Sequence, residues 1–316
     1  MKLAVIGTNG MLSVALSKFF YGQPNVEIES FGRKEPRDYE CNAFYCVDLL
    51  KDELDYSYLC SFDVIFWASG AGCQAASAAD SSLMYALNVN VPIKITQQLK
   101  KLGYKGIFIS FGSYMEIGIN NEDGKEFSES DVVCSVLPVS DDYALSKRIY
   151  GRYMRDFRAD FTVWHFILPN MFSSDDFKPG TRLIPYILQY IQNKKNGAEC
   201  ESPKFSAGIQ TRQFIFLDDL MLVLQKAIEK RIPAGIYNVG GGEFFSIRSL
   251  IERVFAYYKE KCEESYFGQS VRRDGDIKSL RISGDKLYNA IGYLPISKIE
   301  QALEKFDDQA VNFKKD

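Results

Sequence analysis

The stretch "KLAVIGTNGMLS", residues 2–13, decides the fold of this chain. Its first half is a short apolar run that ends in glycine, which is typical of a buried parallel strand. Its second half opens a helix, because the apolar residues from Leu12 to Phe20 recur at helical spacing. The chain therefore begins with a strand that leads through a short turn directly into a helix.

Gly7 and Gly10 lie in that turn. Glycine allows a tight turn and lets the backbone approach a pyrophosphate, which the amides and the dipole of a helix N-terminus then stabilise. The third small position of this pattern, where helix and sheet pack closely, is Ser13 rather than glycine. The turn predicts a dinucleotide-binding site, and a plain glycine turn is the alternative that the motif leaves open.

The alternation of apolar strands and amphipathic helices continues to residue 170. Further strands are expected at residues 26–32, 62–70, 106–112 and 161–170, and helices at residues 86–103 and 141–157. Strands that alternate with helices indicate βαβ units. Because their crossovers are right-handed, the expected fold class is α/β, with a doubly wound parallel sheet of the Rossmann type.

Beyond residue 170 the pattern of elements is less regular. The expected elements are a helix over residues 183–197, a strand that runs into a helix over residues 212–231, and a strand over residues 235–242. We therefore expect two lobes, with residues 1–170 in the Rossmann lobe, residues 171–316 mostly in a smaller C-terminal substrate-binding lobe, and residues 212–240 returning to the first lobe.

The chain has 316 residues, of which 46% are hydrophobic and 25% charged, which is the balance of a soluble globular protein. Its net charge of −3 argues against a nucleic-acid surface, and no apolar run is long enough to span a bilayer. Seven cysteines without a C-x-x-C pair predict reduced thiols and a cytoplasmic location. The single histidine, His165, lies in an apolar run and is expected to pack within a strand, so we expect no metal site.

The residues after the second strand bear on the choice of cofactor. An acidic residue there binds the adenine ribose hydroxyl of NAD. The sequence instead has Arg33 and Lys34, whose positive charges suit the 2′-phosphate of NADP. We expect NADP(H), and NAD is the alternative if Arg33 and Lys34 are only solvated turn residues.

The Tyr-x-x-x-Lys pattern occurs three times, at Tyr143/Lys147, Tyr190/Lys194 and Tyr257/Lys261. On a helix such residues share one face. A nearby ammonium lowers the pKa of a phenol because positive charge favours the phenolate. The spacing alone does not distinguish a catalytic pair from two solvated side chains.

A series of stretches along almost the whole chain resembles, in order, the landmarks of one family. They are "GTNGMLS", "VDLL", "FWASGAG", "LNVNVP", "ISFGSYMEIG", "YALSK", "LPNMF", "RQFIFLDDL", "YNVGGGEFFSIRSL" and "RRDGDIKSL". In this order they resemble the extended short-chain dehydrogenases/reductases of the NAD(P)-dependent nucleotide-sugar epimerase/dehydratase superfamily. Only Tyr143 and Lys147 occupy the family's place for the tyrosine–lysine pair.

The resemblance implies roles for particular residues. The cofactor would be bound by Gly7, Asn9, Gly10, Met11, Arg33, Asp48, Ala68, Gly70, Asn88 and Lys147. Catalysis would use Tyr143, Lys147 and a serine, for which counting back from Gly118 favours Ser113 over Ser110. The substrate would be bound by Ser113, Asn170, Arg212 and Arg273. The family's habit of pairing two helices across a two-fold axis implies a homodimer through residues 82–102 and 143–157, with apolar contact from Tyr150, Met154 and Phe157.

The function that this resemblance implies is an NADP(H)-linked oxidoreductase acting on a nucleotide-diphosphate sugar. Dehydratases of the family carry an Asp-Glu pair where this chain has Tyr114 and Met115, with Glu116 one place later, so dehydration is disfavoured. Arg33 and Lys34 favour a reductase that uses NADPH, and "IPYILQYIQ…GIQTRQFIFLDDL" resembles the 4-keto-6-deoxy-sugar reductases of CDP- and dTDP-sugar pathways. The alternatives are a 4-epimerase with tightly bound NAD and a redox-sensing regulator without catalysis.

Overall fold

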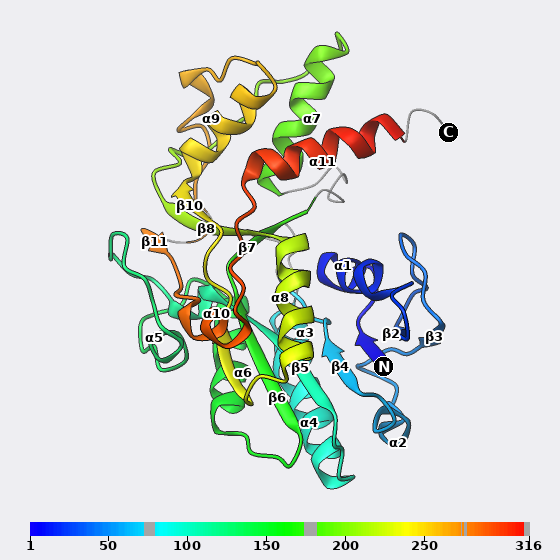
Figure 1. Cartoon of the computed structure of the whole chain (residues 1–316). Helices are drawn as coiled ribbons and strands as arrows, with labels where there is room; N and C mark the ends of the chain where they lie inside the picture. Colours follow the sequence, from blue (N-terminus) through cyan, green and yellow to red (C-terminus); the bar gives the residue numbers. More distant parts are fainter. Residues whose placement is uncertain (73–79, 174–181, 273, 275–276, 313–316) are drawn as a thin grey trace.

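The computed structural model describes residues 1–72, 80–173, 182–272, 274 and 277–312. Within these residues the larger lobe is built on a seven-stranded sheet in the order β3-β2-β1-β4-β5-β6-β9, and every neighbouring pair is parallel. The strands are β1 (Lys2–Ile6), β2 (Glu27–Gly32), β3 (Ala43–Cys46), β4 (Val64–Trp67), β5 (Ile107–Ser113), β6 (Thr162–Leu168) and β9 (Gly235–Asn238). The predicted doubly wound sheet is therefore confirmed (Figure 1).

Helices cover both faces of this sheet, which is why its central strands are buried throughout. One face packs against α1 (Met11–Phe20), α8 (Leu217–Lys230) and α10 (Asp285–Ile291). The other face packs against α2 (Tyr56–Leu59), α4 (Val91–Lys101) and α6 (Asp142–Asp156). Short segments complete this lobe: α3 (Ser81–Tyr85), the π-helix η1 (Ala86–Asn90), the 3-10 helix η2 (Tyr114–Ile117) and α5 (Glu129–Val133).

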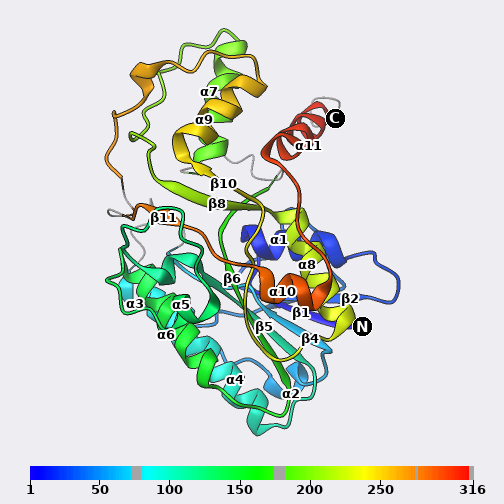
Figure 2. The ribbon, with the colours of Figure 1, turned by 60° about the vertical axis from the view of Figure 1, so that its left-hand side comes forward.

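The smaller lobe has a sheet of its own, in which β8 (Thr211–Phe216) pairs with β7 (Asn170–Phe172), β10 (Glu243–Ser246) and β11 (Ser279–Leu280). Figures 1 and 2 show its three longer helices gathered at one end of the molecule. These are α7 (Leu183–Lys195), α9 (Ile247–Tyr257) and α11 (Ile299–Asn312), and the short η3 (Glu264–Tyr266) lies beside them. An aromatic and aliphatic core, which includes Phe214, Phe216 and Phe255, joins helices and sheet.

Residues 212–240 are divided between the two lobes. β8 belongs to the smaller sheet, whereas α8 packs on α1 and β9 forms the edge of the larger sheet beside β6. The chain thus crosses from one lobe to the other at the junction of β8 and α8, where Phe216 precedes Leu217. Among the described residues, no helix has both the length and the apolar composition needed to cross a bilayer.

Candidate active site

The turn between β1 and α1 is shaped by contact with the neighbouring strand. Gly7 has φ +119°, and a Cβ atom added there would lie 2.9 Å from the carbonyl carbon of Ala68 and from the amide nitrogen of Ser69. Only glycine fits this position. Gly10 caps the start of α1, and its amide donates to the hydroxyl of Ser13 at 3.0 Å. The small serine at the third position thus closes the turn that brings the N-terminus of α1 to the carboxyl edge of the sheet.

Asn9 joins this turn to the loop that follows β2. Its side-chain oxygen accepts from the amide of Arg37 at 3.0 Å, and its amide group donates to the carbonyl of Glu35 at 2.9 Å. The backbone of Asn9 has φ +59°, a conformation that asparagine tolerates better than most residues. Arg33 and Lys34, the predicted cofactor cations, are exposed on the loop that Asn9 holds.

Asn88 lies on η1 and is buried. Its amide exchanges two hydrogen bonds of 2.9 Å with the backbone of Ala71 and donates a third of 2.9 Å to the hydroxyl of Ser146 on α6. A Cβ atom added at Gly70 would lie 3.0 Å from Asn88 Oδ1 and 3.9 Å from Lys147 Nζ. Asn88 therefore holds the loop after β4 against the helix that carries Tyr143 and Lys147.

Tyr143 and Lys147 lie one turn apart on α6, whose first turn is capped by Asp141 accepting from the amide of Ala144 at 2.8 Å. Lys147 Nζ lies 5.9 Å from the centre of the Tyr143 ring. It also donates to the carbonyl of Phe111 on β5 at 3.0 Å. The ammonium is thus fixed between the phenol and the carboxyl end of β5.

The two candidate serines of β5 have different surroundings. Ser110 is fully buried, and its hydroxyl lies 2.9 Å from Nδ1 of His165 on β6. Ser113 is the last residue of β5, and its hydroxyl accepts from the amide of Met115 at 3.3 Å. Because Ser113 lies two residues beyond Phe111, it stands at the strand end that Lys147 contacts, whereas Ser110 lies inside the core.

The two residues in the place of the dehydratase Asp-Glu pair bring no acid to this strand end. Tyr114 is buried and Met115 is only partly exposed. The next residue, Glu116, is also buried, and its carboxyl accepts from the backbone amide of Ser113 at 2.7 Å. Burial raises the pKa of Glu116 to about 7.

The other two Tyr-x-x-x-Lys pairs lie in the smaller lobe. Lys194 forms an ion pair of 2.7 Å with Glu260, and the Tyr190 hydroxyl contacts the Tyr266 hydroxyl at 3.0 Å. The third pair does not share a helix, because α9 ends at Tyr257.

The remaining predicted cofactor residues lie along the same edge of the larger sheet. Asp48 follows β3, and its carboxylate accepts from the amide of Leu50 at 3.1 Å. Ala68 follows β4 and Met11 begins α1. Arg182, at the start of α7, reaches across from the smaller lobe to within 2.7 Å of the Met11 sulfur. The sequence did not predict this cation beside the start of α1.

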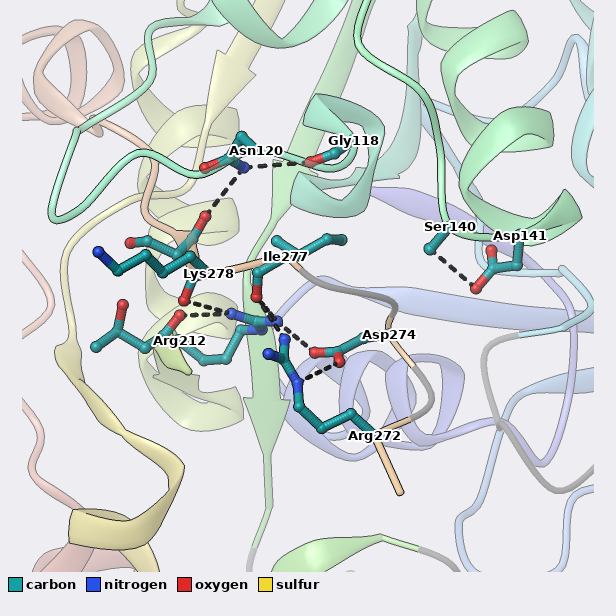
Figure 3. Close-up of polar contacts among 11 residues, drawn as sticks. Gly118, Asn120, Ser140, Asp141, Arg212, Arg272, Asp274, Ile277 and Lys278 are labelled. Atoms are coloured by element: carbon teal, nitrogen blue, oxygen red, sulfur yellow. Dashed lines mark hydrogen bonds and ion pairs between the residues drawn. The ribbon is translucent and has the colours of Figure 1, made fainter. Parts of the chain in front are cut away.

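The smaller lobe contains a cluster of cations at the predicted substrate arginine (Figure 3). Arg212 is buried on β8, forms an ion pair with Asp274 and donates to the carbonyl of Ile277 at 3.0 Å. Arg272 Nε donates to the same carboxylate at 3.1 Å. Arg273, the other predicted arginine, lies outside the described residues.

Asn170 opens β7 and is paired with Phe214 on β8, so it belongs to the same small sheet as Arg212. The structure therefore groups the predicted residues in two sets. Tyr143, Lys147 and Ser113 lie with the cofactor loops of the larger lobe, and Asn170 and Arg212 lie in the smaller lobe. Asp274 and Glu116 were not predicted to bind or to position anything. The sequence signal that could have indicated Asp274 is an acidic residue directly after two arginines, Arg272 and Arg273.

A model of the NAD dependent epimerase/dehydratase family matches residues 3–240 of this chain. An uncharacterized protein of Methanocaldococcus jannaschii is 25% identical over 122 residues, which are 38% of this chain and 36% of that protein. The chain thus matches about a third of the length of this curated relative.

Solved structures share the fold at low identity. A UDP-glucose 4-epimerase of Thermotoga maritima with UDP-glucose has a TM-score of 0.79 at 15% identity, covering 98% of this chain and 100% of that one. A dTDP-glucose 4,6-dehydratase of Streptomyces venezuelae with NAD and TYD bound has a TM-score of 0.74 at 19% identity, covering 96% and 94%. The protein MoeE5 in complex with UDP-glucuronic acid and NAD has a TM-score of 0.76 at 16% identity, covering 96% and 97%.

Proposed function

Because the chain belongs to the NAD dependent epimerase/dehydratase family, we propose that it is an NAD(P)-dependent oxidoreductase acting on a nucleotide-diphosphate sugar. The observation that carries the proposal is the arrangement at the end of β5. There Lys147 Nζ donates to the Phe111 carbonyl and lies 5.9 Å from the Tyr143 ring, and Ser113 ends the same strand. The larger lobe would bind the cofactor and the smaller lobe the substrate.

In this mechanism each residue has one task. A bound nicotinamide cofactor supplies or accepts a hydride at a sugar carbon. Tyr143 gives a proton to the oxygen on that carbon, or removes one in the reverse direction. The Lys147 ammonium favours the phenolate of Tyr143 by its charge. The Ser113 hydroxyl donates a hydrogen bond to the same substrate oxygen.

Among the chemistries of this family we favour reduction of a 4-keto-6-deoxy sugar. Dehydration needs acid–base groups beside the serine for the neighbouring carbons. Tyr114 and Met115 occupy those places, and the Glu116 carboxyl is turned into the core. A reductase consumes one cofactor per turnover, and the exposed Arg33 and Lys34 suit NADPH.

A 4-epimerase is the second candidate. The solved structures with this fold that are described above include an epimerase, and two of them contain NAD. An epimerase reoxidises its own reduced cofactor, so it retains NAD and shows no net consumption. Cofactor released from the denatured protein, identified by chromatography, separates the two candidates.

We also propose a cytoplasmic homodimer, in which residues 82–102, formed by α3, η1 and α4, and the helix α6 pair with their copies across a two-fold axis. Two of the three expected contact residues must be corrected, because Tyr150 and Met154 are buried inside the chain, whereas Phe157 is partly exposed. Ile149, which is 39% exposed on α6, is available instead. Light scattering of the parent and of Ile149→Lys tests this, and a monomeric parent at micromolar concentration contradicts it.

The deciding experiment follows NADPH and NADH oxidation with a panel of UDP, dTDP and CDP sugars, including 4-keto-6-deoxy forms. Oxidation with a keto sugar supports the reductase, and interconversion of two 4-epimers without net oxidation supports the epimerase. Cofactor binding without turnover of any sugar contradicts both and favours a redox-sensing regulator.

A further inference from the structure

Glu116 lies directly behind the proposed catalytic strand end. It belongs to η2, the 3-10 turn that follows β5, and its side chain is fully buried. The carboxyl oxygen Oε1 accepts from the backbone amide of Ser113 at 2.7 Å. The carboxyl thereby closes the turn that begins at Ser113 and fixes the direction in which the Ser113 side chain leaves the strand.

Two glycines on different elements make room for this carboxyl. A Cβ atom added at Gly112 of β5 would lie 2.5 Å from Glu116 Oε1, and one added at Gly151 of α6 would lie 2.6 Å from Glu116 Oε2. Neither glycine has a positive φ, so backbone conformation does not require glycine there. Glycine inside a helix costs about 1 kcal/mol relative to alanine. The carboxyl therefore leaves no room for a side chain at Gly151, and at Gly112 the carboxyl and His165 Nε2, which would lie 2.6 Å from the added Cβ atom, exclude one together.

Gly151 places the carboxyl on a particular face of α6. It lies four residues after Lys147, which lies four residues after Tyr143, so all three share one face of the helix. Lys147 is itself bonded to the Phe111 carbonyl, one residue before Gly112. The Glu116 carboxyl is thus wedged between the strand that ends in Ser113 and the helix that carries the tyrosine–lysine pair.

We propose that Glu116 is a positioning residue, whose buried carboxyl ties Ser113 to the face of α6 that carries Tyr143 and Lys147. The hydroxyl of Ser113 and the phenol of Tyr143 are then held in one geometry toward the same substrate oxygen. This inference rests on the proposed function of the site. It assigns a task to a side chain at the position next to the one where dehydratases of this family carry their Asp-Glu pair.

The groups that face the Glu116 carboxyl determine its charge. From α6 these are Lys147 and Arg148, and from β6 it is His165, since a Cβ atom added at Gly112 would meet both Glu116 Oε1 and His165 Nε2. Burial raises the pKa of Glu116 to about 7, and the cations Lys147 and Arg148 oppose that rise. Burial lowers the pKa of His165 to about 3, so His165 is neutral near pH 7. Above pH 7 the carboxylate is therefore an anion close to Lys147.

The sign of its effect on Tyr143 follows. An anion beside Lys147 offsets part of the ammonium's field and so raises the pKa of the Tyr143 phenol. Two helical turns separate Tyr143 from Gly151, a rise of about 12 Å. Taking this rise as the separation of the two groups and an effective dielectric constant of about 20 to 40, we expect removal of the charge to lower the Tyr143 pKa by roughly 0.5 to 1 unit.

Two variants separate geometry from charge. Glu116→Gln keeps an oxygen that accepts from the Ser113 amide but carries no charge. Glu116→Leu removes both the acceptor and the charge at similar volume. The matched control is Glu122→Gln, which removes an exposed carboxylate six residues further along the chain. For each variant we would measure kcat, KM and their pH dependence, and titrate Tyr143 by NMR with tyrosine labelled at Cζ, assigned with Tyr143→Phe.

We expect Glu116→Leu to lower kcat by about 10- to 100-fold, because a misplaced group costs rate more than binding, while KM stays within about threefold. Glu116→Gln should keep kcat within about threefold near pH 7 and move the Tyr143 titration by roughly 0.5 to 1 unit toward lower pH. The control should change neither. If Glu116→Gln and Glu116→Leu lower the melting temperature but leave kcat and the Tyr143 titration unchanged, Glu116 is only structural and the proposal is wrong.

The NMR titration needs no substrate, so it tests the coupling between Glu116 and the tyrosine–lysine pair even if Glu116→Leu does not fold. A parent protein that turns over no nucleotide sugar contradicts the proposed function. If its Tyr143 still shifts in Glu116→Gln, the coupling between Glu116 and the tyrosine–lysine pair stands. An unshifted Tyr143 in Glu116→Gln overturns that coupling whether or not the parent is active.

Discussion

At the end of β5 the ammonium of Lys147 is held by a neutral carbonyl oxygen, whereas in the smaller lobe the guanidinium groups of Arg212 and Arg272 are held by the carboxylate of Asp274. Both clusters lie at predicted binding sites. Both must keep cations ordered when no ligand is present. In the larger lobe a backbone carbonyl contributes to this order, and in the smaller lobe an internal ion pair does.

This difference has a physical consequence for ligand binding. The Phe111 carbonyl oxygen carries no net charge, so this contact does not neutralise the ammonium that lies beside the Tyr143 ring and favours its phenolate. The Asp274 carboxylate already accepts hydrogen bonds from both guanidinium groups, which are the donors that we expect a diphosphate to use. We therefore expect the first site to be ready for its ligand and the second to require Asp274 to give way.

The largest expected effect tests the readiness of the first site. Tyr143→Phe removes one hydroxyl and little volume, so the fold and cofactor affinity should be kept. Turnover should fall by about 100- to 10,000-fold, the usual contribution of a positioned proton transfer. Steady-state oxidation of the reduced cofactor with the best sugar of the panel measures this.

Tyr190→Phe and Tyr257→Phe are matched controls, because they share the spacing but lie in the smaller lobe. Each should leave turnover within about twofold of the parent. Loss of turnover at either control, with Tyr143→Phe unimpaired, would show that the wrong pair has been chosen. Lys147→Met should be about as damaging as Tyr143→Phe, and the two losses should not add, since both residues serve one proton transfer.

The second prediction concerns the cost of keeping an acid next to the first site. The pKa of Glu116 is raised in the folded chain to about 7, above its ordinary value of 4.5, because burial disfavours the charged form. Its contribution to stability is therefore fully present below pH 4.5 and is lost as the pH rises through 7. Relative to the parent, Glu116→Gln should gain up to about 3 kcal/mol in free energy of unfolding between pH 4.5 and pH 8.

Because His165 also changes the stability of the parent with pH, the effect of Glu116 must be measured as a difference between the variant and the parent. Its pKa is lowered by burial to about 3, so its own contribution is present above pH 6.5 and is lost as the pH falls. The two trends oppose one another between pH 4.5 and 6.5, and only their difference is seen in the parent. Urea unfolding of parent and Glu116→Gln at several pH values isolates the Glu116 part. A pH-independent difference between the two proteins contradicts the prediction.

A smaller effect is expected at the adenine end of the first site. Arg33 is exposed on the loop that Asn9 holds, so we expect a 2′-phosphate to reach it from the solvent. An exposed charge pair contributes up to about 1 kcal/mol, and charge-assisted hydrogen bonds contribute more. Arg33→Ala should weaken NADPH binding by about tenfold and leave NADH binding unchanged.

Fluorescence titration with both cofactors measures the preference. Arg37→Ala is a matched control, because Arg37 is exposed on the same loop and is held there by its backbone amide. Equal dissociation constants for NADPH and NADH in the parent would contradict the choice of NADP and favour NAD.

The sequence predicted most strands of the larger sheet because they carry local signals, but it did not predict the edge strand β3. The run from Leu3 to Ile6 is apolar without interruption, as a strand covered on both faces requires, and Gly7 follows at the turn. The helix expected over residues 86–103 is not one regular α-helix. It begins as the π-helix η1 and continues as α4, and Pro92 lies in the first turn of α4. The spacing of the apolar residues predicted a helix here but not its change from a π-helix to an α-helix.

The smaller lobe was less predictable because its contacts are between distant segments. β8 pairs with β7, β10 and β11, which lie about 40 residues before it and about 30 and 70 after it, and the two-residue β11 has no pattern of its own. The polar contacts of Glu116 and Asp274 were hidden for a similar reason. Gly112 and Gly151 are recognisable as space for a carboxyl only when β5 and α6 are seen together.

The smallest expected effect concerns the second site and tests the comparison directly. Asp274→Asn keeps an oxygen that accepts from Arg272 but removes the negative charge between the two guanidinium groups. Without ligand, the buried Arg212 then loses its ion-pair partner, so the melting temperature should fall. A nucleoside diphosphate should restore it, and its dissociation constant should fall by about three- to tenfold, because binding no longer displaces an internal anion.

Calorimetric titration with UDP and with dTDP measures this affinity, and NADPH binding in the larger lobe should not change. Asp123→Asn is the matched control, since Asp123 pairs with Lys278 on the exposed surface beside the same cluster. If Asp274→Asn binds diphosphates more weakly than the parent while Asp123→Asn does not, Asp274 orders the arginines for the ligand rather than occupying its place. Both sites would then hold their cations in place for the ligand before it binds. The two lobes would differ only in the group that holds the cations, a carbonyl in the larger lobe and a carboxylate in the smaller one.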